Sequence, residues 1–405
     1  MTTTTTQASG LNSPVPSYPM PRTDVLNPPP EYSRLRVERP ITKVTLDFDG
    51  SEVWLVTSYE DAKAILTDVR FSSDFSTPGF PARLTSQPPG PGTFIRMDPP
   101  DQTRLRRLLH PELSRRQTDA LRPTVQQIVD ELIDTMTAAG PPADLIAQFG
   151  LPLPSRVITL LLGVPYEDRE FFHFTTRVMG EQTTAPDERL RVRNELKHYL
   201  EKLVAEKDAD PGDDLLSRMC RRRREAEVSL DEVVGIATLL MVAGYETVAN
   251  QIGVGTVALL QNPEQLAGLR AHPEKIHAAV DELVRHQTVT DYGARRAATA
   301  DVVVGGQLIR KGDGVLVVLS SANRDESIFP EPDQLDFDRT RREHLAFGWG
   351  PHQCVGHLLA RVQLEVAWLT LLRRLPNLEL AVALEEIPFR FDMFVYGVRA
   401  LPVRW

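Results

Sequence analysis

Hydrophobic and polar residues alternate in two short segments near the N-terminus, residues 41–46 and 53–56. Alternation with a period of two predicts β-strands, and the Asp49-Gly50 pair between them is typical of the turn in an antiparallel hairpin. Ser58 then has the character of a helix N-cap before a short apolar segment. The first part of the chain is therefore expected to form a small β region followed by a short helix.

Helical periodicity dominates the rest of the chain. The strongest segment begins at Ser229, which is expected to form a capping box with Glu232, and its apolar pattern continues to Gln261. A helix of this length spans on the order of 50 Å, enough to cross the whole molecule. Because no linker or internal repeat interrupts the pattern, we expect one mainly α domain with a minor β region. Further helices are expected at 98–139, at 273–286 and after Cys354, a long irregular loop at 72–93, and strands at 301–304 and 314–319.

Terminal sequence and composition narrow the possible classes of protein. Residues 1–25 are polar and proline-rich and lack the features of a signal peptide, so we expect a disordered tail before a domain at 26–405. The net charge of -9 argues against a general nucleic-acid or anionic-membrane binder. No apolar run approaches the roughly eighteen residues that a membrane span needs. The two cysteines, Cys220 and Cys354, provide no disulfide framework, so we expect a cytoplasmic protein. We also expect it to be a monomer.

Cys354 lies between glycine-rich turns and the start of an apolar helical pattern. Glycines at positions 348, 350 and 356 permit tight turns and the close approach of a flat partner. A helix N-terminus favours the thiolate, so we expect a lowered pKa for Cys354. A single cysteine is nevertheless more often an inert core residue. The surrounding sequence has to decide between these two interpretations.

That surrounding sequence resembles the haem-ligand loop of cytochromes P450. The residues that carry the resemblance are Phe347, Gly348, Gly350, His352, Cys354, Gly356, Ala360 and Arg361. The whole of 26–405 is similar to soluble actinomycete P450s, which oxidise drugs and tailor secondary metabolites. The resemblance implies the mainly α P450 prism with a small β region, a haem b cofactor, and Cys354 as the iron ligand. In such enzymes the thiolate pushes electron density onto iron and favours O–O cleavage.

A second segment, Ala243-Gly244-Tyr245-Glu246-Thr247, falls in the middle of the long helix. A glycine there costs roughly 1 kcal/mol relative to alanine, and a buried carboxylate needs partners. One interpretation is a bent structural helix in which Thr247 donates to the Ala243 carbonyl. The other is a groove at Ala243-Gly244 for a small ligand, to which Glu246 and Thr247 pass protons. Because the segment resembles the oxygen-activation segment of P450s, the resemblance implies the second interpretation and catalytic roles for Glu246 and Thr247.

Glu282 and Arg285 are three residues apart, which places both side chains on one face of a helix. Most such pairs lie in solvent and contribute little to stability. The resemblance implies that here they correspond to the Glu-x-x-Arg pair of P450s, with Arg339 as the third member. We expect these three residues to be structural rather than catalytic.

The resemblance also implies four residues that bind the haem propionates, since carboxylates call for cations and hydrogen-bond donors. Residues 97–107 look like the propionate-binding helix of the family and place Arg106 and Gln102 there, with Gln102 in the position of the commoner histidine. Arg296 and His352 complete the set.

The sequence indicates the substrate and the redox partners less directly than the haem site. Apolar and aromatic residues near the implied haem site favour a sizeable lipophilic substrate. No glycine-rich nucleotide motif occurs, so the resemblance implies electrons from a ferredoxin and a NAD(P)H-dependent ferredoxin reductase, with O2 as co-substrate. Candidate substrate contacts are Leu239, Val242, Ala243, Tyr292, Ala294, Phe394 and Val395, with Phe75, Phe80 and Leu84 in the irregular loop. A local basic surface that could dock the ferredoxin comprises Arg104, Arg107, Arg115, Arg116 and Arg361.

Two other functions are compatible with parts of the sequence. The first is a haem–thiolate protein that binds gas or another ligand without turnover. The Glu246-Thr247 pair argues against it, because a sensor has no need of a proton relay. The second is a helical structural or interaction protein with coincidental motifs, which would be colourless when purified.

Overall fold

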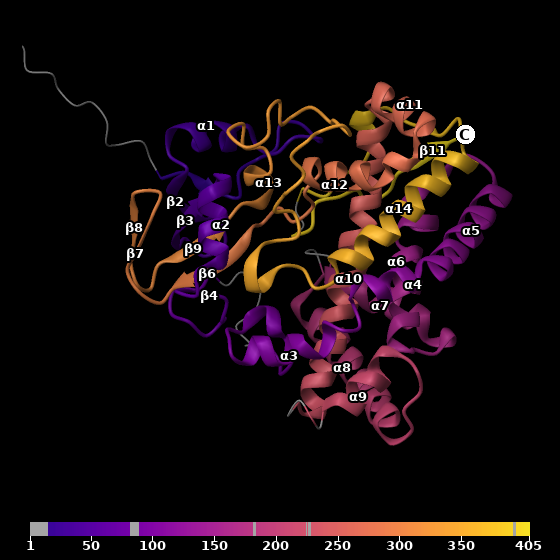
Figure 1. Ribbon diagram of the computed structural model, residues 1–405, viewed down its shortest axis with the longest axis horizontal. Helices are drawn as coiled ribbons and strands as arrows, with labels where there is room; N and C mark the ends of the chain where they lie inside the picture. Colours follow the sequence, from indigo (N-terminus) through magenta and orange to yellow (C-terminus); the bar gives the residue numbers. More distant parts are fainter. Residues whose placement is uncertain (1–14, 82–88, 181–183, 224, 226–227, 392–393) are drawn as a thin grey trace, which may run out of the picture.

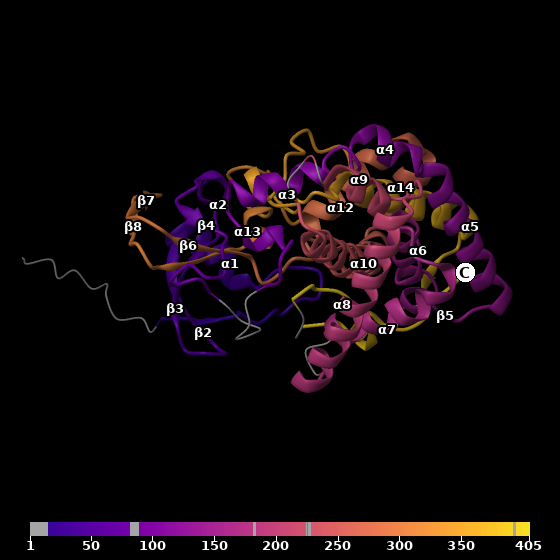
Figure 2. The same ribbon diagram turned by 90° about the horizontal axis from the view of Figure 1, so that it is seen from below.

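The chain folds into a large helical part and a smaller β part that lie side by side (Figures 1 and 2). The computed structural model describes residues 15–81, 89–180, 184–223, 225, 228–391 and 394–405. Its helices are α1 Pro30–Glu38, α2 Tyr59–Thr67, α3 Asp101–Leu109, α4 Arg115–Ala120, α5 Arg122–Ala139, α6 Pro152–Leu162, α7 Arg169–Gly180, α8 Pro186–Ala209, α9 Leu215–Arg223, α10 Leu230–Leu260, α11 Pro263–Ala271, α12 Ile276–His286, α13 Leu319–Ala322 and α14 His357–Arg374. Its strands are β1 Ser17–Tyr18, β2 Ile41–Leu46, β3 Glu52–Val56, β4 Phe71–Ser72, β5 Ala143–Asp144, β6 Ala294–Ala298, β7 Val302–Val304, β8 Gln307–Ile309, β9 Gly314–Val317, β10 Glu379–Leu380 and β11 Pro402–Arg404.

The principal sheet joins strands from both ends of the sequence. Its order is β1-β2-β3-β9-β6-β4, and Figure 1 shows the indigo strand β3 beside the orange strand β9. Strands β2 and β3 form the predicted antiparallel hairpin, whereas β3 and β9 pair in parallel. Strand β6, which the sequence did not predict, pairs antiparallel with β9 and carries Arg296.

Residues 15–25 belong to the fold, so the predicted disordered tail is wrong for this segment. Strand β1 pairs in parallel with β2, and Tyr18 is buried. Arg22 forms an ion pair with Asp291, with 2.8 Å between Nη2 and Oδ1. Both contacts join residues that are remote in sequence, and local composition carries no signal of them. Residues 1–14 of the predicted tail lie outside the described residues.

Helix α10 is the central helix of the helical part. It begins with the predicted capping box, in which the Ser229 and Glu232 side chains each accept a hydrogen bond from the other residue's backbone N–H. It packs against α6, α8 and α14. A Cβ on Gly255 would lie 2.3 Å from Cζ2 of Trp368, so glycine lets α14 approach closely. By length and composition α10 could also cross a membrane, but such a test is passed equally by the core helix of a globular protein.

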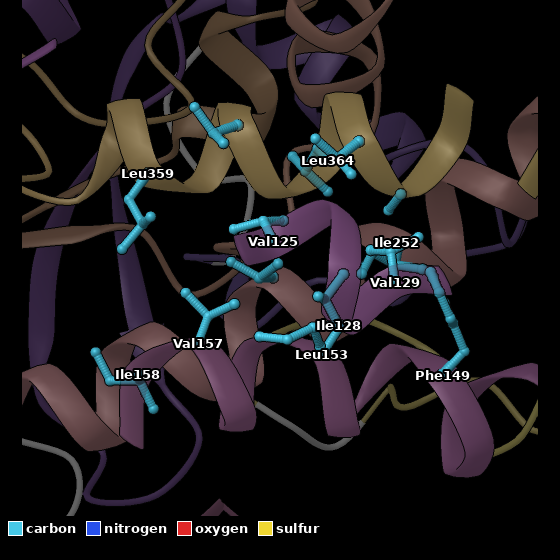
Figure 3. Packing of buried hydrophobic residues seen from close by; sticks show 14 of the residues in the cluster. Val125, Ile128, Val129, Phe149, Leu153, Val157, Ile158, Ile252, Leu359 and Leu364 are labelled. Carbon is cyan, nitrogen blue, oxygen red and sulfur yellow. The ribbon is translucent and has the colours of Figure 1, made fainter. Parts of the chain in front are cut away.

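The largest core lies between α5, α6, α10 and α14 (Figure 3). Val125 of α5 and Val157 of α6 face the row formed by Leu359 and Leu364 of α14. Burying an aliphatic side chain of this size contributes about 1.5–3 kcal/mol. This packing holds the start of α14 at a defined position relative to α10.

The helical segment predicted at 98–139 is divided into α3, α4 and α5. The chain leaves the helix at His110-Pro111, because proline has no N–H to continue the hydrogen-bond ladder. This break gives α3 a direction of its own. It brings Gln102 and Arg106 against the loop that precedes α14.

Candidate functional site

The loop before α14 has a specific and well-braced conformation. Gly348 and Gly350 have φ angles of +69° and +67°, which confirms the turns predicted there. The Cys354 N–H donates to the Phe347 carbonyl over 2.7 Å. A Cβ on Gly350 would lie 2.8 Å from the Leu66 carbonyl oxygen, so α2 packs directly against the loop. The backbone thereby holds Cys354 in one orientation.

The Cys354 thiol opens into a cavity of about 310 Å³ and is accessible from it. Burial within the protein raises the pKa of this thiol, while the Gly356 N–H and the charges of Arg106 and Arg361 act in the opposite direction. The predicted lowering of the pKa is therefore wrong for the protein alone. Helix α14 begins only at His357, so Cys354 precedes the helix instead of occupying its N-terminus. A bound metal ion would deprotonate the thiol outright.

Helix α10 contributes Thr247 and Ala243 to the wall of the same cavity. The Thr247 hydroxyl donates to the Ala243 carbonyl over 2.8 Å. Gly244 does not widen a groove, because a Cβ placed on it would meet the Ile158 side chain of α6 at 3.5 Å. The cavity wall is thus formed here by Ala243 and Thr247, and Gly244 faces Ile158 of α6 instead.

Glu246 does not line this cavity among the described residues. Its Oε1 lies 2.6 Å from Nη2 of Arg390, and both side chains are largely buried. Proton delivery through Glu246 stays a prediction. The structure adds that the carboxylate has a guanidinium partner, supplied by the C-terminal segment.

Basic residues converge on the cavity from three segments, which contribute Arg96, Arg296 and His352. Arg296 of β6 is buried, which lowers its pKa to about 10. Burial, together with the charges of Arg296, Arg106 and Arg96, lowers the pKa of His352 to about 3. A thiol that opens into a mainly apolar cavity matches the needs of haem, which has an iron atom, a flat apolar ring and two carboxylates. Arg96 and Arg296, which form no ion pair within the described part of the chain, could receive the carboxylates. The residues present therefore fit this cofactor.

Comparisons with known proteins agree with the geometry. A family model described as Cytochrome P450 matches residues 184–380. The chain is also 46% identical to Cytochrome P450-SU2 of Streptomyces griseolus, over 94% of this chain and 94% of that protein.

The chain belongs to the cytochrome P450 family.

Two further relatives match nearly the whole length of this P450. Pentalenic acid synthase of Streptomyces avermitilis is 43% identical over 99% of this chain and 100% of its own. The crystal structure of GfsF superposes with a TM-score of 0.91, at 41% identity, and covers 96% of this chain and 100% of its own. The predicted prism fold and haem–thiolate monooxygenase class are thereby confirmed, and nothing in these relatives favours a non-catalytic binding protein.

The predicted structural triad of this P450 lies together in the buried interior. The Glu282 carboxylate accepts two hydrogen bonds from Arg285, at 2.7 and 2.8 Å, and one from Nε of Arg339 at 3.1 Å. Arg285 also donates to the carbonyls of Asn323 and Pro332. These contacts hold the irregular segment before the cysteine loop onto α12.

Gln102 and Arg106 contact the cysteine loop, and their binding of the haem propionates stays a prediction. The Gln102 side chain is buried and Nε2 donates to the Pro351 carbonyl over 2.6 Å. Nη2 of Arg106 donates to the Gln353 carbonyl. Neither residue is among the described residues that line the cavity, whereas Arg296 and His352 are. In this structure Gln102 and Arg106 brace the cysteine loop.

Only some of the predicted substrate contacts line the cavity. Ala243, Ala294 and Phe394 line the cavity. Tyr292 does not line it, but its ring stacks on Phe394 with 6.1 Å between centroids. In the described chain, Leu239, Val242 and Val395 pack into or against the main core instead of lining the cavity. Leu84 lies outside the described residues.

Sequence reasoning missed Arg96 and Arg390. Arg96 lies two residues before the recognised Asp98-Pro99 motif and lines the cavity. The only sign of this role in the sequence was its position beside the segment at 97–107, which was already expected to bind the propionates. Arg390 had no local signal, because its partner Glu246 belongs to a helix far away in the sequence.

Proposed function

We propose that this P450 binds haem b and uses O2 to oxidise a lipophilic small molecule, in secondary-metabolite tailoring or xenobiotic oxidation. The observation that carries the proposal is the opening of the Cys354 thiol into a cavity whose wall includes Thr247 of α10. When bound, haem supplies the iron centre at which O2 is activated and one oxygen atom passes to the substrate. The protein residues bind the haem, orient the substrate and deliver protons.

Cofactor binding is assigned to Cys354 as the iron ligand. Arg296 and His352 face the cavity and are proposed to meet the propionates, with Gln102 and Arg106 securing the loop and adding to the local positive potential. Charge-assisted hydrogen bonds of this kind are about twice as strong as neutral ones.

Proton delivery is assigned to Thr247 and Glu246. The Thr247 proton is held on Oγ1 by the Ala243 carbonyl, at the cavity wall. A hydroxyl in this position can rotate toward the cavity at the cost of one weak hydrogen bond, about 0.5–1.5 kcal/mol. Once its ion pair with Arg390 opens, Glu246 would take up a proton from solvent and pass it to Thr247.

The substrate is proposed to be apolar because the cavity wall is predominantly apolar near α10 and the C-terminal segment. Ala243, Ala294 and Phe394 would contact it. The name of the relative pentalenic acid synthase supports a role in the tailoring of a natural product.

Electrons are proposed to come from an acidic ferredoxin, reduced by a NAD(P)H-dependent ferredoxin reductase. Arg107 on α3 and Arg115 and Arg116 on α4 are exposed and would form the docking surface. Arg104 and Arg361 already pair with Glu232 and Asp281, so they contribute less. Opposite charges across such a surface accelerate encounter and make it sensitive to salt. We further propose that the protein works as a cytoplasmic monomer without binding membranes or nucleic acid.

The decisive experiment is the absorption spectrum of the reduced, CO-bound protein. Wild type should show the red-shifted band of a thiolate-ligated haem, and Cys354→Ala should lose it. Cys220→Ala is the matched control, because Cys220 is buried in the core, where burial raises its pKa to about 11. Absence of the band from wild type, or its survival in Cys354→Ala, would refute the proposal.

A further inference from the structure

Three arginines near the cysteine loop have no carboxylate partner in the described part of the chain. Arg96 and Arg296 line the cavity, and Arg106 donates to a carbonyl of the loop. Burial and the charge of Arg296 together lower the pKa of Arg96 to about 10. Burying cations near one another without anions is costly. The cavity wall at Arg96 and Arg296 therefore favours a negatively charged group.

Arg106 differs from the other two arginines in its surroundings. Its charge interacts with Cys354, and its Nη2 already donates to the Gln353 carbonyl. Arg96 and Arg296 both line the cavity and interact electrostatically with each other.

Three arginines of the described chain line the cavity, Arg96, Arg295 and Arg296. Arg295 precedes Arg296 on β6, so its side chain points to the opposite face of the strand, and it lies over the ring of Phe394. Arg96 and Arg296 are therefore the two arginines that we match to the two carboxylates of haem.

We propose that Arg96 binds a haem propionate alongside Arg296. This inference rests on the proposed haem-binding function. The ring of Phe80 lies 5.4 Å from the Arg96 guanidinium and helps to orient it toward the cavity. Arg96 stands on the short helical turn Phe94–Arg96, which leads into α3, so its backbone is ordered.

A carboxylate could also belong to the substrate. We favour the propionate because Arg96 and Arg296 line the same cavity as Cys354, the proposed iron ligand. An anion bound by either arginine would lie in the cavity into which the thiol opens.

The test measures the rate at which the purified holoenzyme loses haem to an excess of apomyoglobin. Arg96→Ala should lose haem at least about tenfold faster than wild type, as expected for the loss of a charge-assisted hydrogen bond. Arg96→Lys should recover part of the retention. The same proteins are then reconstituted with haem whose two propionates are methyl esters, and here wild type and Arg96→Ala should lose the cofactor at equal rates.

Arg295→Ala is the matched control, because Arg295 is also a buried arginine of the cavity wall but lies over the ring of Phe394, at 5.4 Å. It should show no difference between haem and its diester relative to wild type. Unchanged haem retention in Arg96→Ala would overturn the inference, as would faster loss that persists with the diester. Retention unchanged together with weaker binding of an anionic substrate would assign Arg96 to the substrate instead. A wild type that takes up no haem would refute the proposed function itself.

Discussion

Glu246 of α10 and Arg390 of the C-terminal segment form an ion pair, with 2.6 Å between Oε1 and Nη2. The two side chains are only 17% and 11% exposed. Asn250, one turn further along α10, donates to the Glu246 carbonyl over 2.8 Å and its Oδ1 lies 3.4 Å from Nη1 of Arg390. The segment that carries Phe394 into the cavity thus also holds the carboxylate next to Thr247.

Arg390→Ala should lower the free energy of unfolding by about 1–3 kcal/mol, because it leaves a largely buried carboxylate without its charged partner. Urea denaturation measures the change. The double variant with Glu246→Gln should be less destabilised than the sum of the two single variants. Arg404→Ala is the control, since its pair with Glu379 is 59% exposed on both sides and should be worth less than about 1 kcal/mol. Strict additivity would contradict a coupled pair.

Thr247→Ala should keep haem and substrate binding but waste reducing equivalents as peroxide, because the hydroxyl at the cavity wall no longer supplies a proton. The measurement is the ratio of product formed to NAD(P)H consumed. Thr238→Ala is the matched control, since Thr238 makes the same 2.8 Å hydrogen bond to the carbonyl four residues earlier in α10 but does not line the cavity in the described chain. Equal coupling in both variants would show that Thr247 has no role in proton delivery.

Arg339→Ala should destabilise the protein by about 3–5 kcal/mol, as expected for removing one partner of a buried ion pair. Arg339 is bound to Glu282 and to the carbonyls of Pro330, Glu331 and Gln334. Thermal unfolding of the haem-loaded protein reports the loss. In contrast, Arg34→Ala removes a pair that is more than half exposed and should change stability by less than about 1 kcal/mol. Similar effects from the two variants would rule out a structural triad.

His286 should make the protein less stable at mildly acidic pH. Burial holds the pKa of His286 well below its ordinary value, helped by the charge of Arg324. The ring is neutral between the Asp333 carbonyl and the Gln287 amide, each at 2.9 Å. Unfolded His286 binds a proton below its ordinary pKa of about 6.5, and the folded form does not, so stability is complete above that pH and falls as the pH drops.

The corresponding variant is His286→Gln, and the measurement is the free energy of unfolding between pH 7 and pH 5. Its decline with falling pH should be shallower than that of wild type by up to about 1.4 kcal/mol per pH unit. The control is a glutamine at exposed His110, which should keep the wild-type slope. An unchanged slope in the His286 variant would exclude this residue as the cause.

Local patterns were sufficient for much of this P450. The hairpin of β2 and β3, the capped helix α10 and the turns at Gly348 and Gly350 all follow from neighbours in the chain, where backbone preferences and capping act over a few residues. The Cys354 segment and the Glu282-Arg285 pair could be recognised for the same reason, since each is a short contiguous pattern.

Other features depend on contacts between distant segments. Residues 15–25 are held in place by pairing with β2 and by the ion pair with Asp291. The role of Arg390 likewise depends on its ion pair with Glu246. The pKa of Cys354 is raised where the sequence predicted a lowered value. Burial, which no local pattern records, outweighs the effect of the nearby N–H and arginine charges.

The sequence by itself determined the family, the iron ligand to expect and the capped central helix, because these are encoded in contiguous residues. Only the tertiary structure decided that Gln102 and Arg106 contact the cysteine loop, while Arg96 joins Arg296 at the cavity. Which arginine faces a cavity depends on the direction of α3 and on the packing of α2, β6 and α14 around it. That direction is set by the free energy of burying the whole core, which no single segment of the sequence determines.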